Sequence, residues 1–535
     1  MNKQMHDILE QHYDVAIIGG GLAGLILTRQ LLLKTPQLTI LIVERRTHPV
    51  PEAAYKVGES TVEIGSHYLA EKLQLKAYLE KNHLPKAGLR FFFTHESNKN
   101  IETRLEFGAT TLPPTPSYQL DRGRLENDLR DMVIAAGATF IDKTRVDNVR
   151  LEKECHTLEL QSGSKKQLVT ARWIVDASGR MGLLKKQFGL NQEVHHDVNA
   201  SWFRLDAEID LQQWSKQATW QQQVPDGIRH LSTNHFMGAG YWLWLIPLAS
   251  KATSVGIVAD NDLHPHNTIN TFTAVCTWLK KYEPQAAKIL AQYTSQRRDF
   301  HTLKHFSYNI TQVYSEKRWA ITGEAGAFLD PFYSPGTDFI SISNDFVCDL
   351  IIRDYKNEDI ARRTFFHNQL YLSMVNSFFN IYSQQYPLMG NVSVMLTKIV
   401  WDYAAYWGIT GLLYFSNKLC DLNFMTELLS KLHQFGELNN KMQLFFRKWQ
   451  PTAVAEVNAG FIDTLSLPLL QKFNSELQHT FNDQELMEKL VRNLSLLQHL
   501  ADTIILLSPT LIVKSKHEST LSAASLDKFL RKICA

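Results

Sequence analysis

The sequence predicts an α/β protein in three parts: a parallel β-sheet domain, an antiparallel β-sheet domain and an appended helical C-terminal region. A glycine-rich loop between a buried strand and a helix predicts the first part. Alternating segments rich in Trp, Phe and Thr predict the second part. After residue 350 strand patterning stops and long helical patterns begin. We therefore expect domains at residues 1–195 together with 301–350, at residues 196–300 and at residues 351–535.

The composition is that of an ordinary globular protein. Its 535 residues suffice for two or three packed units, and 44% of them are hydrophobic and 21% charged. A net charge of +2 does not indicate a nucleic-acid partner. The five cysteines are scattered without a CxxC pair, so we expect neither a disulfide framework nor a zinc site, and a reducing compartment is favoured. No third ligand accompanies the paired histidines at residues 195–196 and 264–266, so no metal is expected.

No targeting or membrane segment is expected from the sequence. Residues 1–14 lack the apolar run of a secretory signal. The longest late apolar run, residues 503–513, is interrupted by Pro509 and is shorter than the ~18 residues that a spanning helix needs. A cytoplasmic protein without a transmembrane segment is the resulting expectation, and a homodimer stays open.

The first chemical motif is the loop that contains Gly19, Gly21, Ala23 and Gly24. It follows a predicted buried strand at residues 14–18 and begins a predicted helix at residues 22–33. Such glycines let the backbone turn tightly and approach a pyrophosphate, which the N–H groups of the helix then bind. A second predicted strand, residues 38–43, ends at Glu44 and Arg45, where a carboxylate can accept hydrogen bonds from ribose hydroxyls. This βαβ unit predicts a Rossmann-type dinucleotide-binding domain.

Two later elements indicate FAD rather than NAD. Asp176 begins the segment Asp-Ala-Ser-Gly after a short buried strand, and Gly323 and Glu324 begin a turn that reaches Pro331. These elements resemble the second and third signatures of the FAD-dependent monooxygenase superfamily. The resemblance implies that Glu324, where Asp is usual, contacts the ribityl chain of the flavin. Arg122 resembles the cofactor-facing arginine of that superfamily, with an ordinary surface arginine as the alternative.

Three further motifs resemble the flavin-dependent halogenases, the tryptophan-halogenase-like branch of that superfamily. The segment from Trp242 through Trp244 to Pro247 matches WxWxIP, and the segment from Phe328 to Gly336 matches FxxPxxSxG. Lys86 and the basic residue four positions later resemble the segment of the catalytic lysine. Gly58, Glu59 and Ser60 resemble a GES-type segment over the flavin. The alternatives are an aromatic core strand for the tryptophans and a solvated lysine for Lys86.

The resemblance implies halogenation that depends on reduced FAD, O2 and chloride or bromide. Halide would be oxidised to hypohalous acid, which Lys86 would direct toward an electron-rich carbon, with Trp242 and Trp244 between flavin and substrate. Ser334 would lie at the halide, which the backbone of Gly336 and Thr337 would hold, because Pro335 has no N–H to donate. With one dinucleotide loop, the chain is expected to need a separate NAD(P)H flavin reductase.

Tyr333 stands where the tryptophan halogenases carry a glutamate, which favours a phenolic, pyrrolic or carrier-bound substrate. The aromatic stretch in the helical region is expected either to line a substrate pocket or to be core; it runs from Phe365 through Trp401, Tyr403, Tyr406 and Trp407. Three alternatives to a halogenase remain open: a flavin hydroxylase, a flavin-dependent reductase of prenyl chains and a flavoprotein without activity.

Overall fold

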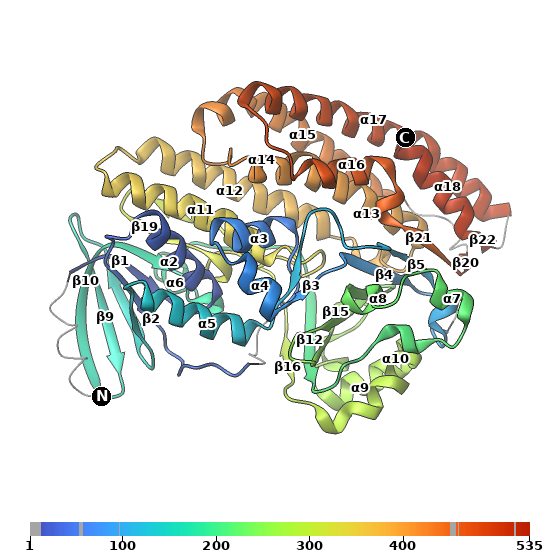
Figure 1. The fold of residues 1–535 in the computed structure, drawn as a ribbon, viewed down its shortest axis with the longest axis horizontal. Helices are drawn as coiled ribbons and strands as arrows, with labels where there is room; N and C mark the ends of the chain where they lie inside the picture. The colour runs from blue at the N-terminus through green and yellow to red at the C-terminus, as the bar shows by residue number, and fades with distance from the viewer. Residues whose placement is uncertain (1–11, 53–56, 96, 450–455, 458, 518–519) are drawn as a thin grey trace.

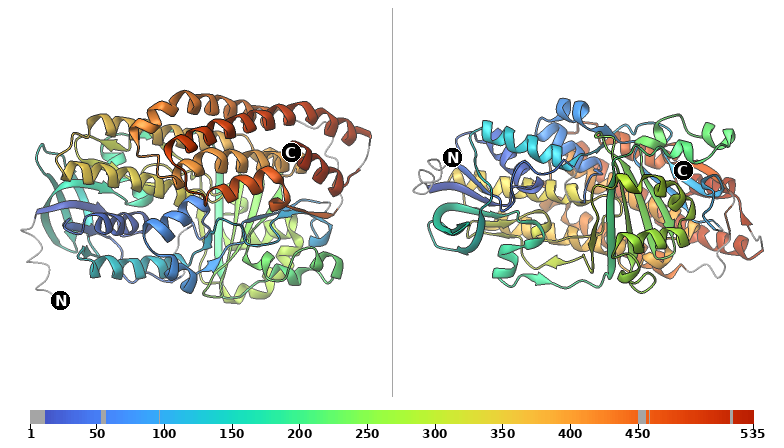
Figure 2. Two further views of the ribbon diagram at one scale, coloured as in Figure 1. Left: turned by 45° about the horizontal axis from the view of Figure 1, so that its top comes forward. Right: turned by 90° about the horizontal axis from the view of Figure 1, so that it is seen from below.

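The structure is a computed structural model that describes residues 12–52, 57–95, 97–449, 456–457, 459–517 and 520–535. The segment 1–11, on which the expectation of no secretory signal rests, lies outside these residues. Figure 1 shows a layer of long helices lying across two neighbouring sheet regions. The turned views of Figure 2 show the same helices along one side of both sheets.

The first sheet is the predicted parallel one. Six of its eight strands have the order β18-β19-β10-β1-β2-β7, and β1 pairs in parallel with both β10 and β2. The other two are β9 (His156–Ser162), antiparallel to β10, and β8 (Arg145–Arg150), antiparallel to β9. The helix that follows the glycine loop connects β1 to β2, as the βαβ prediction requires, and packs against α5. The main elements are β1 (His12–Ile18), α2 (Leu22–Lys34), β2 (Ile40–Val43), α5 (Arg122–Ala135), β7 (Thr139–Ile141), β10 (Lys165–Asp176), β18 (Tyr314–Ser315) and β19 (Trp319–Ile321). The Rossmann-type prediction is confirmed.

The second sheet is largely antiparallel and larger than predicted. Its order is β16-β12-β15-β14-β13-β4-β5-β21, with β13 and β4 paired in parallel. The strands are β4 (Leu89–Phe93), β5 (Leu105–Gly108), β12 (Val198–Leu205), β13 (Thr233–Gly238), β14 (Tyr241–Pro247), β15 (Thr253–Asp260), β16 (His301–Leu303) and β21 (Gly460–Asp463). The expectation that strands end at residue 350 is wrong at β21 and at the two-residue strands β20 (Glu456–Val457) and β22 (Thr520–Leu521), which pair with each other. Strand β21 is the one that extends the second sheet. This strand has four residues and pairs with β5, more than 350 residues earlier, so no local periodicity marks it.

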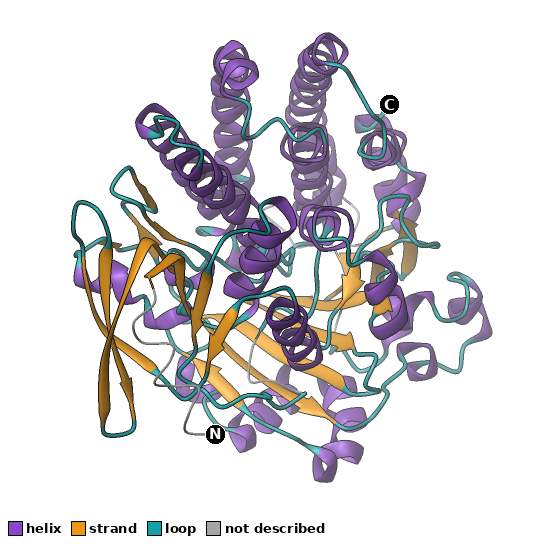
Figure 3. Cartoon of the chain, turned by 60° about the vertical axis from the view of Figure 1, so that its left-hand side comes forward, coloured by secondary structure: helices purple, strands orange, loops and turns teal. Residues whose placement is uncertain are grey.

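The C-terminal helices pack on the sheets and on one another. Figure 3 shows the long helices as a bundle along one side of the orange strands. Helices α12 and α17 each pack against α15, and α13 packs against α16 and α17. The helices are α11 (Gly336–Tyr355), α12 (Ala361–Tyr382), α13 (Val392–Ala405), α15 (Leu422–Lys448), α16 (Pro468–Glu476), α17 (Asp483–His517) and α18 (Ala523–Ile533). One continuous apolar core joins them to the parallel sheet.

Helix α17 contains the one stretch of the described residues, Asp483–Pro509, that is long and apolar enough to cross a membrane. Its mean hydropathy is 1.2 and a third of the stretch is buried against the protein. Core helices of globular proteins pass the same criterion, so length and composition alone do not assign this helix to a membrane. The expectation above considered only the apolar run at residues 503–513, which Pro509 interrupts, and did not consider this longer segment.

Candidate functional site

The glycine loop forms the floor of an open cleft. Gly19 has φ of +115°, and a Cβ on Gly24 would lie 2.2 Å from the carbonyl oxygen of Gly19. Both positions therefore need glycine. The Gly20 N–H donates to Glu44 Oε2 at 2.7 Å, which joins the loop to the end of β2. The cleft has a volume of about 490 Å³, and of the predicted residues Gly19, Gly21, Ala23, Glu44, Arg45, Arg122 and Glu324 line it.

Asp176 occupies a different place from the other predicted cofactor residues. It is fully buried at the end of β10 and is not among the residues that line the cleft. Its carboxylate accepts hydrogen bonds from Ser178 N at 2.9 Å and from Leu184 N at 2.7 Å. Asp176 thus holds the shape of the loop that borders the cleft.

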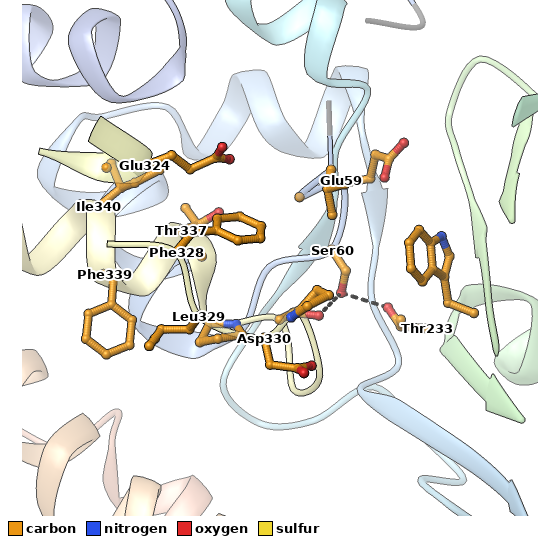
Figure 4. A pocket seen from close by; sticks show the side chains of 18 of the residues that line it. Glu59, Ser60, Thr233, Glu324, Phe328, Leu329, Asp330, Thr337, Phe339 and Ile340 are labelled. Carbon is orange, nitrogen blue, oxygen red and sulfur yellow. Dashed lines mark hydrogen bonds between the residues drawn. The ribbon is translucent and has the colours of Figure 1, made fainter. Parts of the chain in front are cut away.

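A second cavity, the tryptophan cavity, continues from the cleft. The two share Val57, Arg122, Glu324, Phe328 and Ile340 in their linings. Figure 4 shows Glu324, Phe328, Thr337 and Ile340 on one side of it and Glu59, Ser60 and Thr233 on the other. Its wall contains the predicted residues Gly58, Glu59, Ser60, Trp242, Trp244, Gly323, Pro331, Ser334, Gly336 and Thr337. The structure therefore brings together motifs that lie nearly 280 residues apart.

The two tryptophans of β14 are both core and cavity wall. Each is only 2% exposed, and both line the tryptophan cavity. Trp242 Nε1 donates to Tyr386 OH at 2.9 Å, and Tyr386 OH donates to Asp330 Oδ2 at 2.6 Å. His196 Nε2 lies 2.7 Å from the same carboxylate oxygen. This network ties Trp242 to the turn that carries Pro331, so the indole is held rigidly against the cavity.

Lys86 is not a solvated lysine, because it is only 1% exposed. Its Nζ donates to Ser60 Oγ at 2.7 Å and to Thr61 O at 2.6 Å. Ser60 Oγ in turn lies 3.0 Å from Ser334 Oγ. Burial lowers the pKa of Lys86 to about 7, against the opposing effect of the carboxylates of Glu63 and Asp338.

Lys86 opens onto a third cavity, the Lys86 cavity, which has a volume of about 80 Å³. Tyr333 and Pro335 lie in its wall, and Pro335 also lines the tryptophan cavity. Tyr333 and Ser334 have φ of +69° and +59°, a strained left-handed turn that separates the two cavities. Tyr333 OH donates to Asp402 Oδ2 at 2.9 Å, which fixes the ring in this wall.

Helix α11 begins directly after this turn. Pro335 is its N-cap, and Gly336 and Thr337 are its first residues, at the edge of the tryptophan cavity. The first N–H groups of a helix have no partner within the helix and favour negative charge. The halide position predicted at Gly336 and Thr337 thus coincides with a helix N-terminus at the cavity edge, and halide binding there stays a prediction.

Comparison with known proteins identifies the family. A family model described as an FAD binding domain matches residues 12–298. Flavin-dependent halogenase chlA of Dictyostelium discoideum is 30% identical over 435 residues, which cover 74% of this chain and 70% of that protein. The chain is a flavin-dependent halogenase. The prediction of this family from the motifs at Lys86, Trp242 and Phe328 is confirmed.

More distant halogenases share most of the chain length. A 1H-pyrrole-2-carbonyl-(peptidyl-carrier protein) chlorinase of Pseudomonas fluorescens is 23% identical, over 80% of this chain and 95% of that protein. Among solved structures, halogenase PltM has a TM-score of 0.66 at 18% identity, over 90% of this chain and 99% of that chain. The fold of these halogenases therefore includes the C-terminal helices.

The cleft of this halogenase fits the FAD that its family binds. The close approach at Gly19 and Gly24 lets the glycine loop pass along the cleft without side chains, as a pyrophosphate site requires, and Glu44 lies at the end of β2 in the cleft lining, where a ribose acceptor would lie. Arg122 reaches the cleft and the tryptophan cavity, and donates to the carbonyls of Val57 and Gly58. The tryptophan cavity continues from the end of this cleft and shares five lining residues with it.

The halogenase also has site residues that the sequence did not indicate. Glu63 and Asp338 line the Lys86 cavity, and His235 lines the tryptophan cavity. Burial and the neighbouring Lys86 lower the pKa of His235 to about 3, so its ring is neutral. None of these residues belongs to a recognisable motif, and only the fold brings them to the cavities.

The aromatic stretch of the helical region divides between both predicted roles. Tyr403, Tyr406 and Trp407 line the Lys86 cavity. Trp401 is core, fully buried with its indole N–H on Asn439 Oδ1 at 3.0 Å. Phe365 is 69% exposed and belongs to neither group.

Two further groups of polar side chains form ion pairs within the protein. Glu59 lines the tryptophan cavity but forms a buried ion pair with Arg204, N···O 2.7 Å. Asp349, His367 and Cys420 place three potential metal-ligand atoms within 4.8 Å of one another. The guanidinium groups of Arg353 and Arg363 also pair with Asp349, so positive charge already compensates that carboxylate.

Proposed function

We propose that this halogenase transfers chlorine or bromine to an electron-rich aromatic substrate bound in the Lys86 cavity. When bound in reduced form, FAD would supply the reaction with O2 that oxidises the halide. The hypohalous acid would form in the tryptophan cavity, beside the backbone of Gly336 and Thr337, and reach Lys86 next to the substrate. A phenol, a pyrrole or a carrier-bound acid meets the requirement for an electron-rich ring.

The observation that supports this proposal most is the position of Ser60. Its hydroxyl lines the tryptophan cavity and accepts a hydrogen bond from Lys86, whose side chain lines the substrate side. An ammonium group there can donate to the oxygen of hypohalous acid and orient the halogen toward the ring. Tyr333 forms part of the barrier between the two cavities, in place of the glutamate of tryptophan halogenases.

Reduced flavin would come from a separate NAD(P)H flavin reductase in the cytoplasm. The described residues contain one glycine loop of the dinucleotide type, at Gly19–Gly24, and FAD accounts for it. The chlorinase of Pseudomonas fluorescens named above carries a carrier-bound pyrrole in its name. The test therefore includes both free and carrier-bound substrates.

The test combines the purified protein with a flavin reductase, NADH, FAD, O2, bromide or chloride, and electron-rich aromatic compounds. Mass spectrometry should detect halogenated product, and none without halide. Lys86→Met should lower product by about 100-fold or more while flavin reoxidation continues. Lys81→Met, at an exposed lysine nearby, is the matched control. Equally efficient hydroxylation in halide-free buffer would instead identify a hydroxylase and refute the proposal.

A further inference from the structure

The Lys86 cavity has a charged end formed by three buried groups. Lys86, Glu63 and Asp338 all line it, and they are 1%, 7% and 2% exposed. They come from a loop before β4, from the short helix α3 (Glu63–His67) and from the first turn of α11. Two acids and one base in an enclosed space form a cluster in which protons can be exchanged.

The carboxylates of Asp338 and Glu63 differ in the hydrogen bonds that they accept. Asp338 accepts from Gly65 N at 2.8 Å on one oxygen and from Tyr406 OH at 2.6 Å on the other. Glu63 Oε1 accepts a long hydrogen bond, 3.4 Å, from Asn474 Nδ2, and the Trp407 indole lies beside the same carboxyl as a weak donor. Burial raises the pKa of Glu63 despite the nearby Lys86. Glu63 is thus the carboxylate with capacity left for a ligand.

Two donors beside Glu63 lack a partner among the described residues. Trp407 Nε1 and Tyr403 OH are buried and make no hydrogen bond there, although both residues line the cavity. The Trp407 indole N–H lies beside the Glu63 carboxyl and, as a donor toward it, lowers its pKa, although the contact is longer than a normal hydrogen bond. Buried donors are nearly always paired in native proteins, so these two point to a polar group on the ligand.

The rest of the cavity wall selects a flat apolar body. Leu89, Phe378, Ile381 and Leu465 line it, and Tyr333 contributes its ring; Asp402 also lines it, but its carboxylate is already paired with Lys398 and Tyr333 OH. An aromatic ring matches these surfaces, with its polar atom at the end formed by Glu63 and Trp407. A phenolic oxygen both donates and accepts, so one atom satisfies the Glu63 carboxylate and the Trp407 N–H together. A pyrrole N–H only donates and leaves Trp407 unpaired.

We propose that the substrate is a phenol, and that Glu63 is the general base that receives its hydroxyl proton during halogen transfer. This inference rests on the function proposed above. Ring carbon bonds to the halogen, the halogen–oxygen bond of hypohalous acid breaks, and Lys86 protonates the departing oxygen to give water. The phenolic proton passes to Glu63 at the same time. Lys86 then takes the ring C–H proton, and Glu63 returns its proton to the oxygen, which regenerates the aromatic phenol and both residues.

Ligand binding, measured without turnover, tests the assignment of a phenol as substrate. Resorcinol, its dimethyl ether and pyrrole-2-carboxamide are titrated into the FAD-loaded protein, and quenching of tryptophan fluorescence or calorimetry gives each Kd. Resorcinol should bind about tenfold more tightly than its dimethyl ether, and Trp407→Phe should remove most of that difference. Equal binding of the ether, or tighter binding of the pyrrole, would overturn the assignment of a phenol.

Turnover then tests the role of Glu63. Glu63→Gln keeps a hydrogen-bond acceptor but cannot take a proton, so kcat for resorcinol should fall by about 100-fold with little change in KM. The acid limb of the pH profile should disappear, and the slow reaction of the dimethyl ether should be unchanged. Glu71→Gln, at an exposed glutamate of the neighbouring turn, is the control.

The outcomes separate this inference from the proposed function. Full activity of Glu63→Gln on resorcinol would refute Glu63 as the base while leaving the halogenase function intact. Absence of halogenated product from every probe, together with halide-independent flavin reoxidation, would instead refute the proposed function. In that case the order of the Kd values still decides whether the cavity recognises a phenol.

Discussion

Lys86 Nζ and Ser334 Oγ contact the same atom, Ser60 Oγ, at 2.7 and 3.0 Å. Lys86 faces the Lys86 cavity and Ser334 the tryptophan cavity, so one hydroxyl joins the two cavities of the site. The two residues are 248 positions apart in the sequence. Any species that passes from one cavity to the other at this point meets Ser60 on its way.

Removal of the Ser60 hydroxyl should impair the transfer of hypohalous acid from the tryptophan cavity to the Lys86 cavity. Ser60→Ala leaves Lys86 with Thr61 O as its remaining acceptor, so the ammonium loses its fixed position. We expect halogenated product to fall by about tenfold or more, while hypohalous acid escapes to solution. The ratio of product to hypohalous acid trapped by added thioether measures this. Ser495→Ala, at an exposed serine of α17, is the control and should behave like the wild type. An unchanged ratio in Ser60→Ala would show that the Ser60 hydroxyl does not position Lys86 for halogen transfer.

The pH profile should report the titration of Lys86. Burial lowers the pKa of Lys86 to about 7, so the ammonium is present below that pH and is lost as pH rises through it. If the ammonium orients hypohalous acid, kcat/KM should decline on an alkaline limb near 7. A limb that stays near the ordinary lysine range, about pH 10, would contradict this role. Stopped-flow measurement of flavin reoxidation at each pH shows whether the decline lies in halogen transfer.

Asp338 should destabilise the fold as pH rises. Burial raises its pKa from 3.8 to about 7, so between these values the folded state holds a proton that the unfolded state has lost. The free energy of unfolding therefore falls with pH across this interval, by up to about 1.4 kcal/mol per pH unit. Asp338→Asn removes this slope and should be progressively more stable than the wild type from about pH 5 to about pH 8. Melting temperatures across this range, with Asp262→Asn at an exposed site as control, test the sign.

Tyr386 should keep Trp242 in place. Tyr386→Phe removes the hydroxyl that accepts from Trp242 and donates to Asp330. We expect a loss of about 1–3 kcal/mol in the free energy of unfolding, because two buried polar groups lose their partner. Misplacement of the indole wall should also raise the fraction of O2 released as hydrogen peroxide. Tyr355→Phe, at an exposed tyrosine, should alter neither quantity; an unchanged peroxide fraction in Tyr386→Phe would show that the network is only structural.

FAD affinity should depend on the absence of a side chain at Gly24. A Cβ there would lie 2.2 Å from Gly19 O, a backbone atom that cannot move without opening the loop. Gly24→Ala should therefore weaken FAD binding by at least about 100-fold, measured by flavin fluorescence. Gly436→Ala, in α15 with nothing within 4 Å of the added Cβ, should bind FAD normally. Equal affinities of the two variants would contradict a pyrophosphate site at this loop.

Several features of this halogenase were predictable from the sequence, because they depend on local constraints. The loop at Gly19 and Gly24 needs residues without side chains, and the alternation of Trp242 and Trp244 follows from strand geometry. The parallel strands around them are short buried runs whose neighbours in the βαβ unit are close in sequence. These constraints act within some 30 residues and are therefore visible in the order of residues.

The tertiary structure decided what surrounds Lys86. Its burial, the convergence of Glu63 and Asp338 on its cavity, and the position of the Trp407 indole in the same cavity depend on how α3, α11 and the C-terminal helices pack. The strand β21, which completes the second sheet, depends likewise on a pairing across more than 350 residues. Packing is collective and nearly independent of sequence spacing, so a charged residue in a polar segment gives no local sign that it is enclosed. Whether Lys86 was an exposed charge or a buried base with a lowered pKa was decided by this packing alone.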